Sequence, residues 1–244
     1  MTTLFVSDLH LSPARPAQTS LFLEFLACAQ KSAQALYILG DLFEVWLGDD
    51  DDAAANTAVI SALATLSAAG VTVRVGFGNR DFLYGPHFVA ASGAQLLDDY
   101  AVIDLYGTPT LLTHGDLLCT RDIKYQRFRR IVRHPLVRRL FLSTPLAWRQ
   151  RIARRTRAGT IASMQRKDAA VMDVDETTVS AIMAHYKVNL LIHGHTHRPA
   201  VHKYELGQRR RIVLGDWYEQ DAVLVCDERA QHPMRISEFI SAST

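Results

Sequence analysis

Five short polar strings, each placed directly after an apolar run, constrain the fold of this chain more than any other feature. The strings are DLH at 8–10, GD at 40–41, GNRD at 78–81, HGD at 114–116 and GHTH at 194–197. The runs before them (TLFVS, ALYIL, VTVRVGF, PTLLT and VNLLI) are rich in β-branched and aromatic residues, which is typical of buried strands. Ligands bind beyond the carboxyl ends of strands in α/β sheets. We therefore expect an α/β fold that brings the five strings together.

The residue types in these strings are those of a metal site. Residues two apart in an extended segment face the same side, so Asp8 and His10 can bind one ion together, as can His195 and His197. Asp41 follows a glycine that allows close approach of the backbone, and its two carboxylate oxygens can bridge two cations. The remaining candidate ligands are Asn79 and His114.

This ligand chemistry indicates a catalytic centre. None of the candidate ligands is a thiolate, which argues against a closed structural zinc site. Oxygen and imidazole ligands suit manganese, iron or catalytic zinc. Two metal ions about 3.5–4 Å apart are a recurrent device for in-line attack on phosphorus. His193 has the wrong alternation phase for a ligand, so we expect it to lie behind the site or in the core.

The bulk properties predict one large core. The chain has 244 residues, 48% of them hydrophobic, and its three cysteines form no paired motif, which suggests a reducing compartment. We expect Cys28 to fill the core. No secretory signal and no membrane-spanning stretch is visible. We expect helices at 18–32, 53–69 and 174–186, and late strands at 189–192, 211–214, 222–226 and 235–240.

Two features next to the polar strings carry open alternatives. Glu44 and Trp46 follow the GD turn closely enough to brace the site or meet substrate, and core packing is an equal alternative for Trp46. The acid run at 49–52 is interpreted as a solvated loop that starts a helix, since negative charge suits a helix N-terminus.

Residues 121–167 interrupt the core, 1–120 and 168–244, with a basic helical insertion. The insertion contains 15 Lys or Arg and one acid, a formal charge of +14, while the rest of the chain has 12 against 24, or −12. Three interpretations compete: a solvated cap, a nucleic-acid patch and an interfacial segment that meets anionic lipid. Apolar residues such as Phe128, Leu140 and Trp148 alternate with the arginines, and no nucleic-acid motif is present. We therefore expect an anionic membrane surface as partner, and no nucleic acid.

The five strings together resemble the pattern of the calcineurin-like metallophosphoesterases, from Asp8 to His197. The resemblance implies an α/β fold of four layers, two packed sheets flanked by helices, with the basic insertion added. It also implies two divalent metal ions, which we expect to be manganese. The first ion would be bound by Asp8, His10, Asp41 and His197. The second would be bound by Asp41, Asn79, His114 and His195, so that Asp41 is shared.

One position departs from that family pattern. The family has histidine where this chain has Arg80, and arginine cannot deliver a proton to a leaving alkoxide at neutral pH. Arginine can hold phosphate oxygens in a bidentate grip. A phosphate monoester needs no proton to depart, because its second pKa is about 6. Arg80 thus favours cleavage of a diphosphate; the alternative is that Arg80 merely pairs with Asp81.

GNRD, the GDLFExW stretch and the basic insertion resemble the UDP-2,3-diacylglucosamine diphosphatases of lipid A biosynthesis. That resemblance implies attack of water on the uridine-side phosphorus, and a peripheral location on the cytoplasmic face of a bacterial inner membrane. The implied substrate contacts are Asn79, Arg80, Asp122, Thr160, Met164, Lys167 and His195, with Tyr125 as an addition. The other hypotheses are a nuclease or phosphatase of the superfamily, and a metal-free scaffold. No obligate protein partner is evident.

Overall fold

The computed structural model describes residues 2–51, 54–164, 173–218, 220 and 222–243, with backbone only at 54–55, 158–164, 206 and 243. Its first sheet has the order β11 (Gln231–Arg235), β10 (Ala222–Cys226), β1 (Thr2–Val6), β2 (Ala33–Ile38), β3 (Thr72–Val75) and β4 (Gln95–Leu96). The strands from β1 to β4 are parallel, and β10 and β11 run antiparallel to their neighbours. The carboxyl ends of β1, β2 and β3 therefore meet at one edge.

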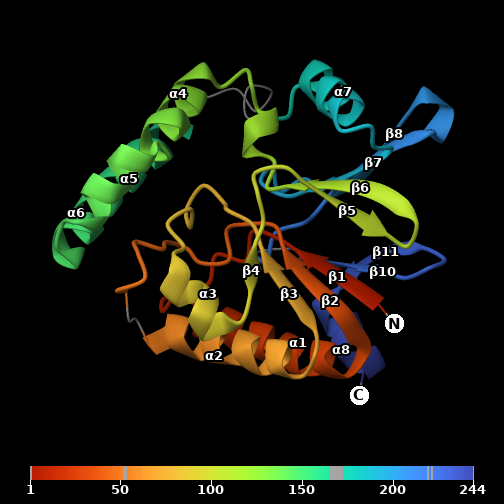
Figure 1. Cartoon of the computed structure of the whole chain (residues 1–244), viewed down its shortest axis with the longest axis horizontal. Coiled ribbons are helices and arrows are strands. Elements are labelled where there is room, and N and C mark those ends of the chain that lie inside the picture. The colour runs from red at the N-terminus through yellow and green to blue at the C-terminus, as the bar shows by residue number, and fades with distance from the viewer. Residues whose placement is uncertain (1, 52–53, 165–172, 219, 221, 244) are drawn as a thin grey trace.

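The second sheet has the order β5 (Ala101–Leu105), β6 (Thr108–Thr113), β7 (Leu190–His193), β9 (Arg209–Val213) and β8 (Ala200–Tyr204). β6, β7 and β9 are parallel, with Thr113 level with His193 and His193 level with Val213. The ends of these three strands lie at the same end of the molecule as those of the first sheet (Figure 1). The five strands expected from the apolar runs are all present, as β1, β2, β3, β6 and β7.

The layers follow from side chains that alternate along each strand. Phe5 and Tyr37 face the core between the two sheets, whereas Leu4 and Val6 face the helices α1 (Pro16–Ser32), α2 (Ala54–Ala68) and α8 (Ile236–Ser243). On the second sheet, Leu191 packs against α7 (Glu176–His185). The short helix α3 (Pro86–Ser92) packs on α2. The result is the expected order of helices, sheet, sheet and helix (Figure 1).

Most of the expected helices and late strands are confirmed, and one is wrong. The run at 235–240, expected to be a strand, lies in helix α8, which follows the edge strand β11. Its apolar residues Ile236, Phe239 and Ile240 recur with helical spacing, and Ile236 and Phe239 are buried against α1. A short apolar run does not separate strand from helix by itself. Cys28 is buried in α1, as expected.

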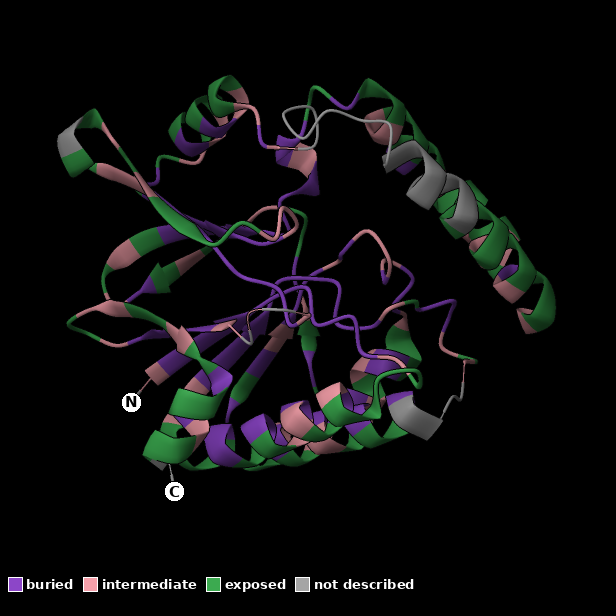
Figure 2. Ribbon diagram, turned by 180° about the vertical axis from the view of Figure 1, so that it is seen from behind, coloured by how far each residue is buried: buried purple, intermediate pink, exposed green. Residues whose placement is uncertain are grey.

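The insertion forms three helices, α4 (Ile123–Val132), α5 (Pro135–Leu142) and α6 (Leu146–Met164). They lie along one side of the molecule and are largely exposed (Figure 2). Pro135 occupies the first turn of α5, where its missing N–H leaves no bond unmade. Among the helices of the described residues, none has the length and apolar character needed to cross a membrane.

Candidate metal centre

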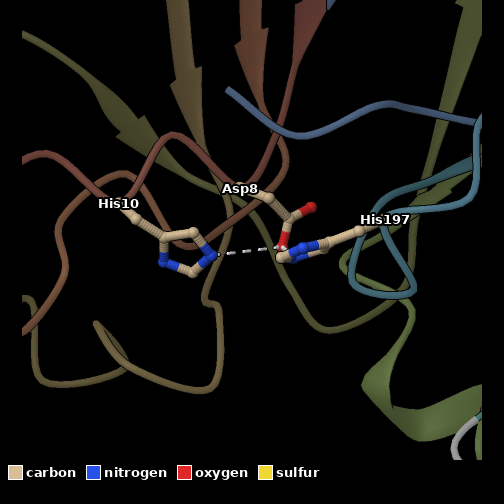
Figure 3. Close-up of side chains that lie close together, drawn as sticks. All are labelled: Asp8, His10 and His197. Carbon is tan, nitrogen blue, oxygen red and sulfur yellow. Dashed lines mark hydrogen bonds and ion pairs between the residues drawn. The ribbon is translucent and has the colours of Figure 1, made fainter. Parts of the chain in front are cut away.

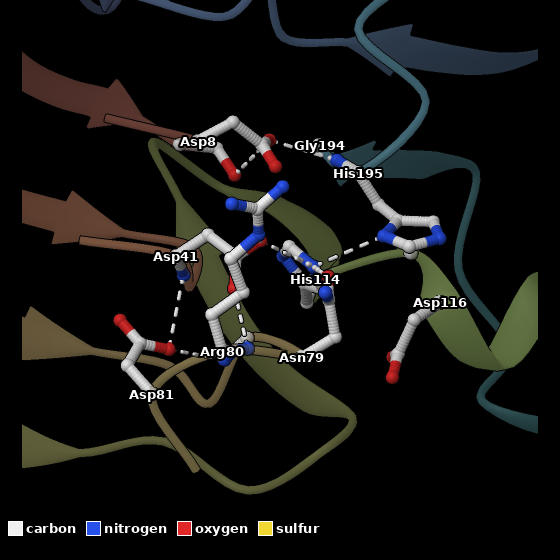
Figure 4. A network of polar contacts seen from close by, with 12 residues as sticks. Asp8, Asp41, Asn79, Arg80, Asp81, His114, Asp116, Gly194 and His195 are labelled. Carbon is white, nitrogen blue, oxygen red and sulfur yellow. Dashed lines mark hydrogen bonds and ion pairs between the residues drawn. The ribbon is translucent and has the colours of Figure 1, made fainter. Parts of the chain in front are cut away.

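The polar strings meet where strands of both sheets end. Asp8 and His10 follow β1, Asp41 follows β2, and the GNRD loop follows β3. From the second sheet, His114 follows β6, and the GHTH loop follows β7. The side chains of the two sheets face each other across the seam between them (Figure 4).

The backbone at these positions is strained. Asp8, His10, Asp41, His195 and His197 all have left-handed φ angles, between 50° and 70°. Such non-glycine residues cost about 1–3 kcal/mol each and persist only where the surroundings enforce them. Here hydrogen bonds link the loops after β1 and β2: the N–H of Asp8 donates to the carbonyl of Gly40, and that of His10 to the carbonyl of Asp41. The two-residue spacing was interpreted for extended segments, and the backbone is not extended at these residues. Asp8 and His10 nevertheless lie close together.

Two glycines allow the loops to pack this closely. A Cβ on Gly78 would lie 2.1 Å from Oδ1 of Asp41, and a Cβ on Gly194 would lie 2.3 Å from Oδ2 of Asp8. Real Cβ atoms essentially never come within 3.0 Å of a neighbour. The glycines of the GNRD and GHTH strings are therefore required by the approach of backbone to carboxylate.

Asp8, His10 and His197 form the first of two clusters that could hold a metal ion (Figure 3). Oδ1 of Asp8 is 4.0 Å from Nε2 of His10 and 3.2 Å from Nε2 of His197. The other ring nitrogen of His197, Nδ1, is 3.2 Å from Oδ2 of Asp216. A carboxylate behind a ligating imidazole orients the ring and fixes its tautomer.

Asp8, Asp41 and His114 form the second cluster. Nδ1 of His114 lies 2.9 Å from the carbonyl oxygen of Leu39, so it donates there and leaves Nε2 as the acceptor. That Nε2 is 3.9 Å from Oδ2 of Asp41, 3.1 Å from Oδ1 of Asn79 and 3.2 Å from Nδ1 of His195. Asp8 belongs to both clusters, whereas the residue expected to be shared was Asp41. Oδ2 of Asp41, a member of the second cluster, also lies 3.8 Å from Nε2 of His10 in the first.

The charges of this region fit divalent cations. Burial lowers the pKa of His10 to about 2 and that of His195 to about 4, so both imidazoles are neutral. Both ring nitrogens of His10 are buried, and neither has a hydrogen-bond partner among the described residues. Burial raises the pKa of Asp41 to about 7, and the carboxylates of Asp81 and Asp8 add to the rise. A cation would use the unsatisfied imidazole and relieve the crowded carboxylates.

Arg80 and Asp81 of the GNRD string have separate roles. Oδ2 of Asp81 accepts from the N–H of Leu42 at 2.7 Å and from the Tyr84 hydroxyl at 2.6 Å, so this carboxylate holds the loop after β2. Nη1 of Arg80 pairs instead with Oε1 of Glu44. The alternative in which Arg80 pairs with Asp81 is therefore not seen among the described contacts.

Glu44 braces the site. Besides Arg80, it pairs with Arg157 of α6, accepts a 2.6 Å hydrogen bond from the Tyr218 hydroxyl and lies 3.7 Å from Nδ1 of His10. Trp46, by contrast, is buried and stacks on Phe43 with ring centroids 5.2 Å apart. Of the two readings for Trp46, the structure supports core packing.

The expected substrate contacts of the insertion are placed only in part. The Asp122 side chain caps α4 by accepting the N–H of Tyr125 at 3.1 Å. The Tyr125 ring lies 6.2 Å from the His195 ring, and its hydroxyl donates to Asp116 at 2.6 Å. Thr160 and Met164 lie on α6, but their side chains are outside the described part of the chain, and Lys167 lies outside the described residues altogether.

The acid run was expected to be a solvated loop that starts a helix, and its first two residues have more specific roles. Asp49 accepts from the N–H groups of Gly85 and His87, at 3.0 and 2.9 Å, and so caps α3 rather than α2. Asp50 pairs with Arg149, which is 1% exposed. Residues 52–53 lie outside the described residues. Cap geometry of this kind depends on contacts between loops far apart in sequence.

The structure adds residues to which the sequence assigned no role. Asp216, which lies behind His197, belongs to a further GD pair, Gly215–Asp216, one residue after the end of β9. The same pattern of a strand followed by GD could therefore have identified Asp216 from the sequence. Asp116 belongs to the HGD string and is 1% exposed. His193 is fully buried, with Nδ1 2.8 Å from the Gly194 carbonyl, as expected for a residue behind the site.

Comparison with known proteins gives the family. The model of the calcineurin-like phosphoesterases matches residues 1–199. The chain belongs to this family. It is 52% identical over 236 residues to a UDP-2,3-diacylglucosamine hydrolase of Stenotrophomonas maltophilia, covering 93% of this chain and 95% of the relative. It is 49% identical over 226 residues to one of Serratia proteamaculans, covering 92% and 94%.

Solved structures share the fold of this phosphoesterase. A novel archaeal phosphodiesterase matches with a TM-score of 0.50 and 12% identity, over 96% of this chain and 99% of its own. Yfce, a phosphoesterase from E. coli, matches with a TM-score of 0.50 and 18% identity, over 98% and 94%. The expected family and the packing of two sheets between helices are thereby confirmed.

Proposed function

We propose that this phosphoesterase hydrolyses the diphosphate of UDP-2,3-diacylglucosamine in lipid A biosynthesis. Water attacks the uridine-side phosphorus, the bond from that phosphorus to the bridging oxygen breaks, and UMP and 2,3-diacylglucosamine 1-phosphate leave. The relatives that carry this activity in their names are about half identical over more than nine-tenths of the chain. The observation that carries the proposal is the convergence of carboxylates and neutral imidazoles from five loops on one seam.

The proposed ligands are the seven residues of the sequence prediction, with Asp41 shared between two sites. Two divalent ions, expected to be Mn²⁺, lower the pKa of water and neutralise charge on the transferring group when bound. Asp41 belongs to the second cluster and also lies 3.8 Å from His10 of the first. Its carboxylate is held against the GNRD loop by the 2.9 Å bond from the N–H of Arg80 to its Oδ1. The protein thus holds in place, before substrate arrives, the carboxylate that the two proposed sites would share.

The proposed roles at phosphorus fall to Arg80 and His195. The Arg80 guanidinium is 29% exposed and held by Glu44, so it can turn its free N–H groups to phosphate oxygens. The imidazole of His195 is fixed by its 3.2 Å contact with His114. Donors held in advance where charge develops are the usual source of large rate enhancement. The departing phosphate needs no proton from the site, because its second pKa is about 6.

The decisive assay is release of UMP from the acylated UDP-sugar with added manganese. Asn79→Ala and His10→Asn should each abolish most of the rate, and elemental analysis of wild type should find two ions per chain. Equal rates in all three proteins would refute the assigned site. Turnover of single-stranded nucleic acid or phosphopeptides instead would support the hypothesis of another activity in the same superfamily.

We further propose that the insertion docks on the anionic, cytoplasmic face of the inner membrane, where the acylated substrate resides. Large apolar side chains are exposed on all three of its helices, with Ile131 61%, Leu136 and Leu140 71%, and Trp148 68% exposed. Apolar residues beside arginines suit the headgroup boundary of a bilayer. The double variant Leu136→Ser/Leu140→Ser should lose sedimentation with anionic vesicles while its hydrolysis of detergent-dispersed substrate persists; unchanged sedimentation would contradict this docking.

A further inference from the structure

One face of α4 carries a stripe of polar side chains directed at the core. Tyr125, Arg129 and Arg133 are spaced by four residues, which places them one above another on a helix. Each of the three binds an acceptor of the phosphoesterase core rather than another group of the insertion. This face therefore joins the insertion to the loops of the candidate metal centre.

The middle of the stripe is an ion network that is buried at Arg129 and Asp116 and exposed at Asp99. Nε of Arg129 donates to Oδ2 of Asp116 at 2.7 Å, and its Nη2 donates to Oδ1 of Asp99 at 2.8 Å. Asp116 is 1% exposed and Arg129 9%. Buried charges of this kind stabilise little in net terms, but each becomes costly once its partner is removed. They therefore fix one position of α4 relative to the loop after β6.

Arg133 extends the network to the GNRD loop. Its Nη1 donates to Oδ1 of Asp99 at 2.7 Å, and its Nη2 donates to the carbonyl oxygen of Gly78 at 2.6 Å. The N–H of Gly78 donates to Oδ1 of Asp81 at 2.9 Å. Gly78 is thus held on both sides, by Asp81 from within the loop and by Arg133 from the insertion.

The held carbonyl belongs to the peptide unit that leads into Asn79. Because a peptide unit is planar, fixing the Gly78 oxygen also fixes the nitrogen of Asn79 and limits the position of its Cα. The amide oxygen of Asn79 lies 3.1 Å from Nε2 of His114, and both atoms must point to the same place if they are to bind one ion. Without Arg133, the bonds from the N–H of Gly78 to Asp81 and from the N–H of Arg80 to Asp41 would remain. The Gly78 carbonyl would then lose the bond that Arg133 makes to it.

We propose that Arg133 is a positioning residue that makes the metal-binding geometry of Asn79 depend on the place of the insertion. Asp99, which is 40% exposed at its side chain, orients the Arg133 guanidinium. A planar fork is needed for this task because one group must reach a carboxylate and a backbone carbonyl at once. The inference rests on the proposed role of Asn79 as a metal ligand.

The test is a calorimetric titration of metal-stripped protein with Mn²⁺, alongside kcat and KM for UMP release. Loss of a residue that orients a ligand typically weakens metal binding or activity about 10- to 100-fold. Arg133→Met should raise the Kd of one Mn²⁺ site, the one to which Asn79 contributes, by that factor and lower kcat with little change in KM. Arg133→Lys should recover part of the loss, and Asp99→Asn, at a more exposed position, should shift the Kd in the same direction.

Arg149→Met is the matched control. Arg149 is a buried arginine that also anchors the insertion, through Asp50 and the carbonyl of Leu47, without touching the GNRD loop. The Arg149→Met variant should unfold at a lower temperature than wild type and bind Mn²⁺ with an unchanged Kd. An equal Kd shift in the Arg149 and Arg133 variants, or none in Arg133→Met, would overturn the positioning role. If Asn79→Ala leaves Mn²⁺ binding intact, the ligand proposal itself fails.

Discussion

A single methyl group at Gly194 should disable the metal centre while leaving the protein folded. A Cβ at this position would lie 2.1 Å from Oγ of Ser7 and 2.3 Å from Oδ2 of Asp8. That carboxylate oxygen accepts the Ser7 hydroxyl at 2.7 Å and the N–H of His195 at 2.8 Å. The new methyl group would therefore enter the space in which both hydrogen bonds position Asp8.

The size of the effect follows from these distances. To reach the 3.0 Å limit of real Cβ contacts from 2.3 Å, Oδ2 of Asp8 must move by at least 0.7 Å. A misplacement of about 1 Å in a reacting site costs about 10²-fold in rate, or about 2.7 kcal/mol of barrier. Overpacking costs about 1–3 kcal/mol of stability, which is less than the 5–15 kcal/mol typical of a domain. Gly194→Ala should thus fold and be nearly inactive.

The assay is UMP release with saturating manganese, together with thermal unfolding of the metal-free protein. Gly76→Ala is the control, because Gly76 follows β3 at the same end of the sheet and its nearest neighbours lie at 3.6 Å, an ordinary contact. We expect the control to keep wild-type activity. A Gly194→Ala protein with wild-type kcat and wild-type Mn²⁺ affinity would refute the claim that the added methyl group displaces Asp8 from a metal-binding position.

Two further predictions concern charge at the site. Burial raises the pKa of Asp41 to about 7. Burial alone would lower the pKa of His114 and of His197, but nearby carboxylates outweigh burial, so the pKa of each imidazole is raised. These groups must lose protons to bind a cation, so Mn²⁺ affinity should fall from about pH 8 to about pH 6, with protons released on binding; a chelator competition that gives equal Kd values at both would contradict this. Arg80→Met should lower kcat about 10²-fold, as for the loss of one donor at an oxyanion. Arg80→Lys, with Glu44 unchanged, should recover part of the lost rate. Faster diphosphate cleavage by Arg80→His would contradict the role assigned to Arg80.

The strands and the polar strings were predictable because both depend on local sequence. A buried strand is apolar, and a polar string follows the end of each strand, so their order along the chain was enough to find the candidate ligands Asp8, Asp41 and His114. The same rule applied to Gly215–Asp216 would have added Asp216. Helix α8 was misread as a strand because its short apolar run fits either period.

The supports of the site could not be predicted, because they join loops that are distant in sequence. The spacing of Tyr125, Arg129 and Arg133 is visible in the chain, but nothing local shows that Asp99 and Asp116 will meet that stripe. Left-handed backbone at the candidate ligands is equally hidden in the sequence, since aspartate and histidine do not require that conformation. Tertiary contacts decide both features.

The basic residues of the insertion that the structure describes, all but Arg166 and Lys167, divide into two groups with different consequences. Arg121, Arg129, Arg133, Arg149 and Arg157 pair with acids of the core. Eight others have no ion pair among the described residues: Lys124, Arg127, Arg130, Arg138, Arg139, Arg151, Arg154 and Arg155. Among the described basic residues, the second group is the one free to attract anionic lipid, so their number alone overstates the charge that a membrane meets.

The unpaired group should therefore control binding to vesicles. Each basic residue near an anionic membrane contributes about 1 kcal/mol, so the double variant Arg130→Ser/Arg139→Ser should bind about 30-fold more weakly. The matched control is Arg121→Ser, whose guanidinium is already paired with Asp175 at 2.8 Å. Sedimentation with anionic vesicles at low and high salt measures the difference, since added salt should reduce it. If the Arg121 variant weakens binding as much as the double variant does, the division of the arginines is wrong, because a paired charge would then attract lipid as strongly as a free one.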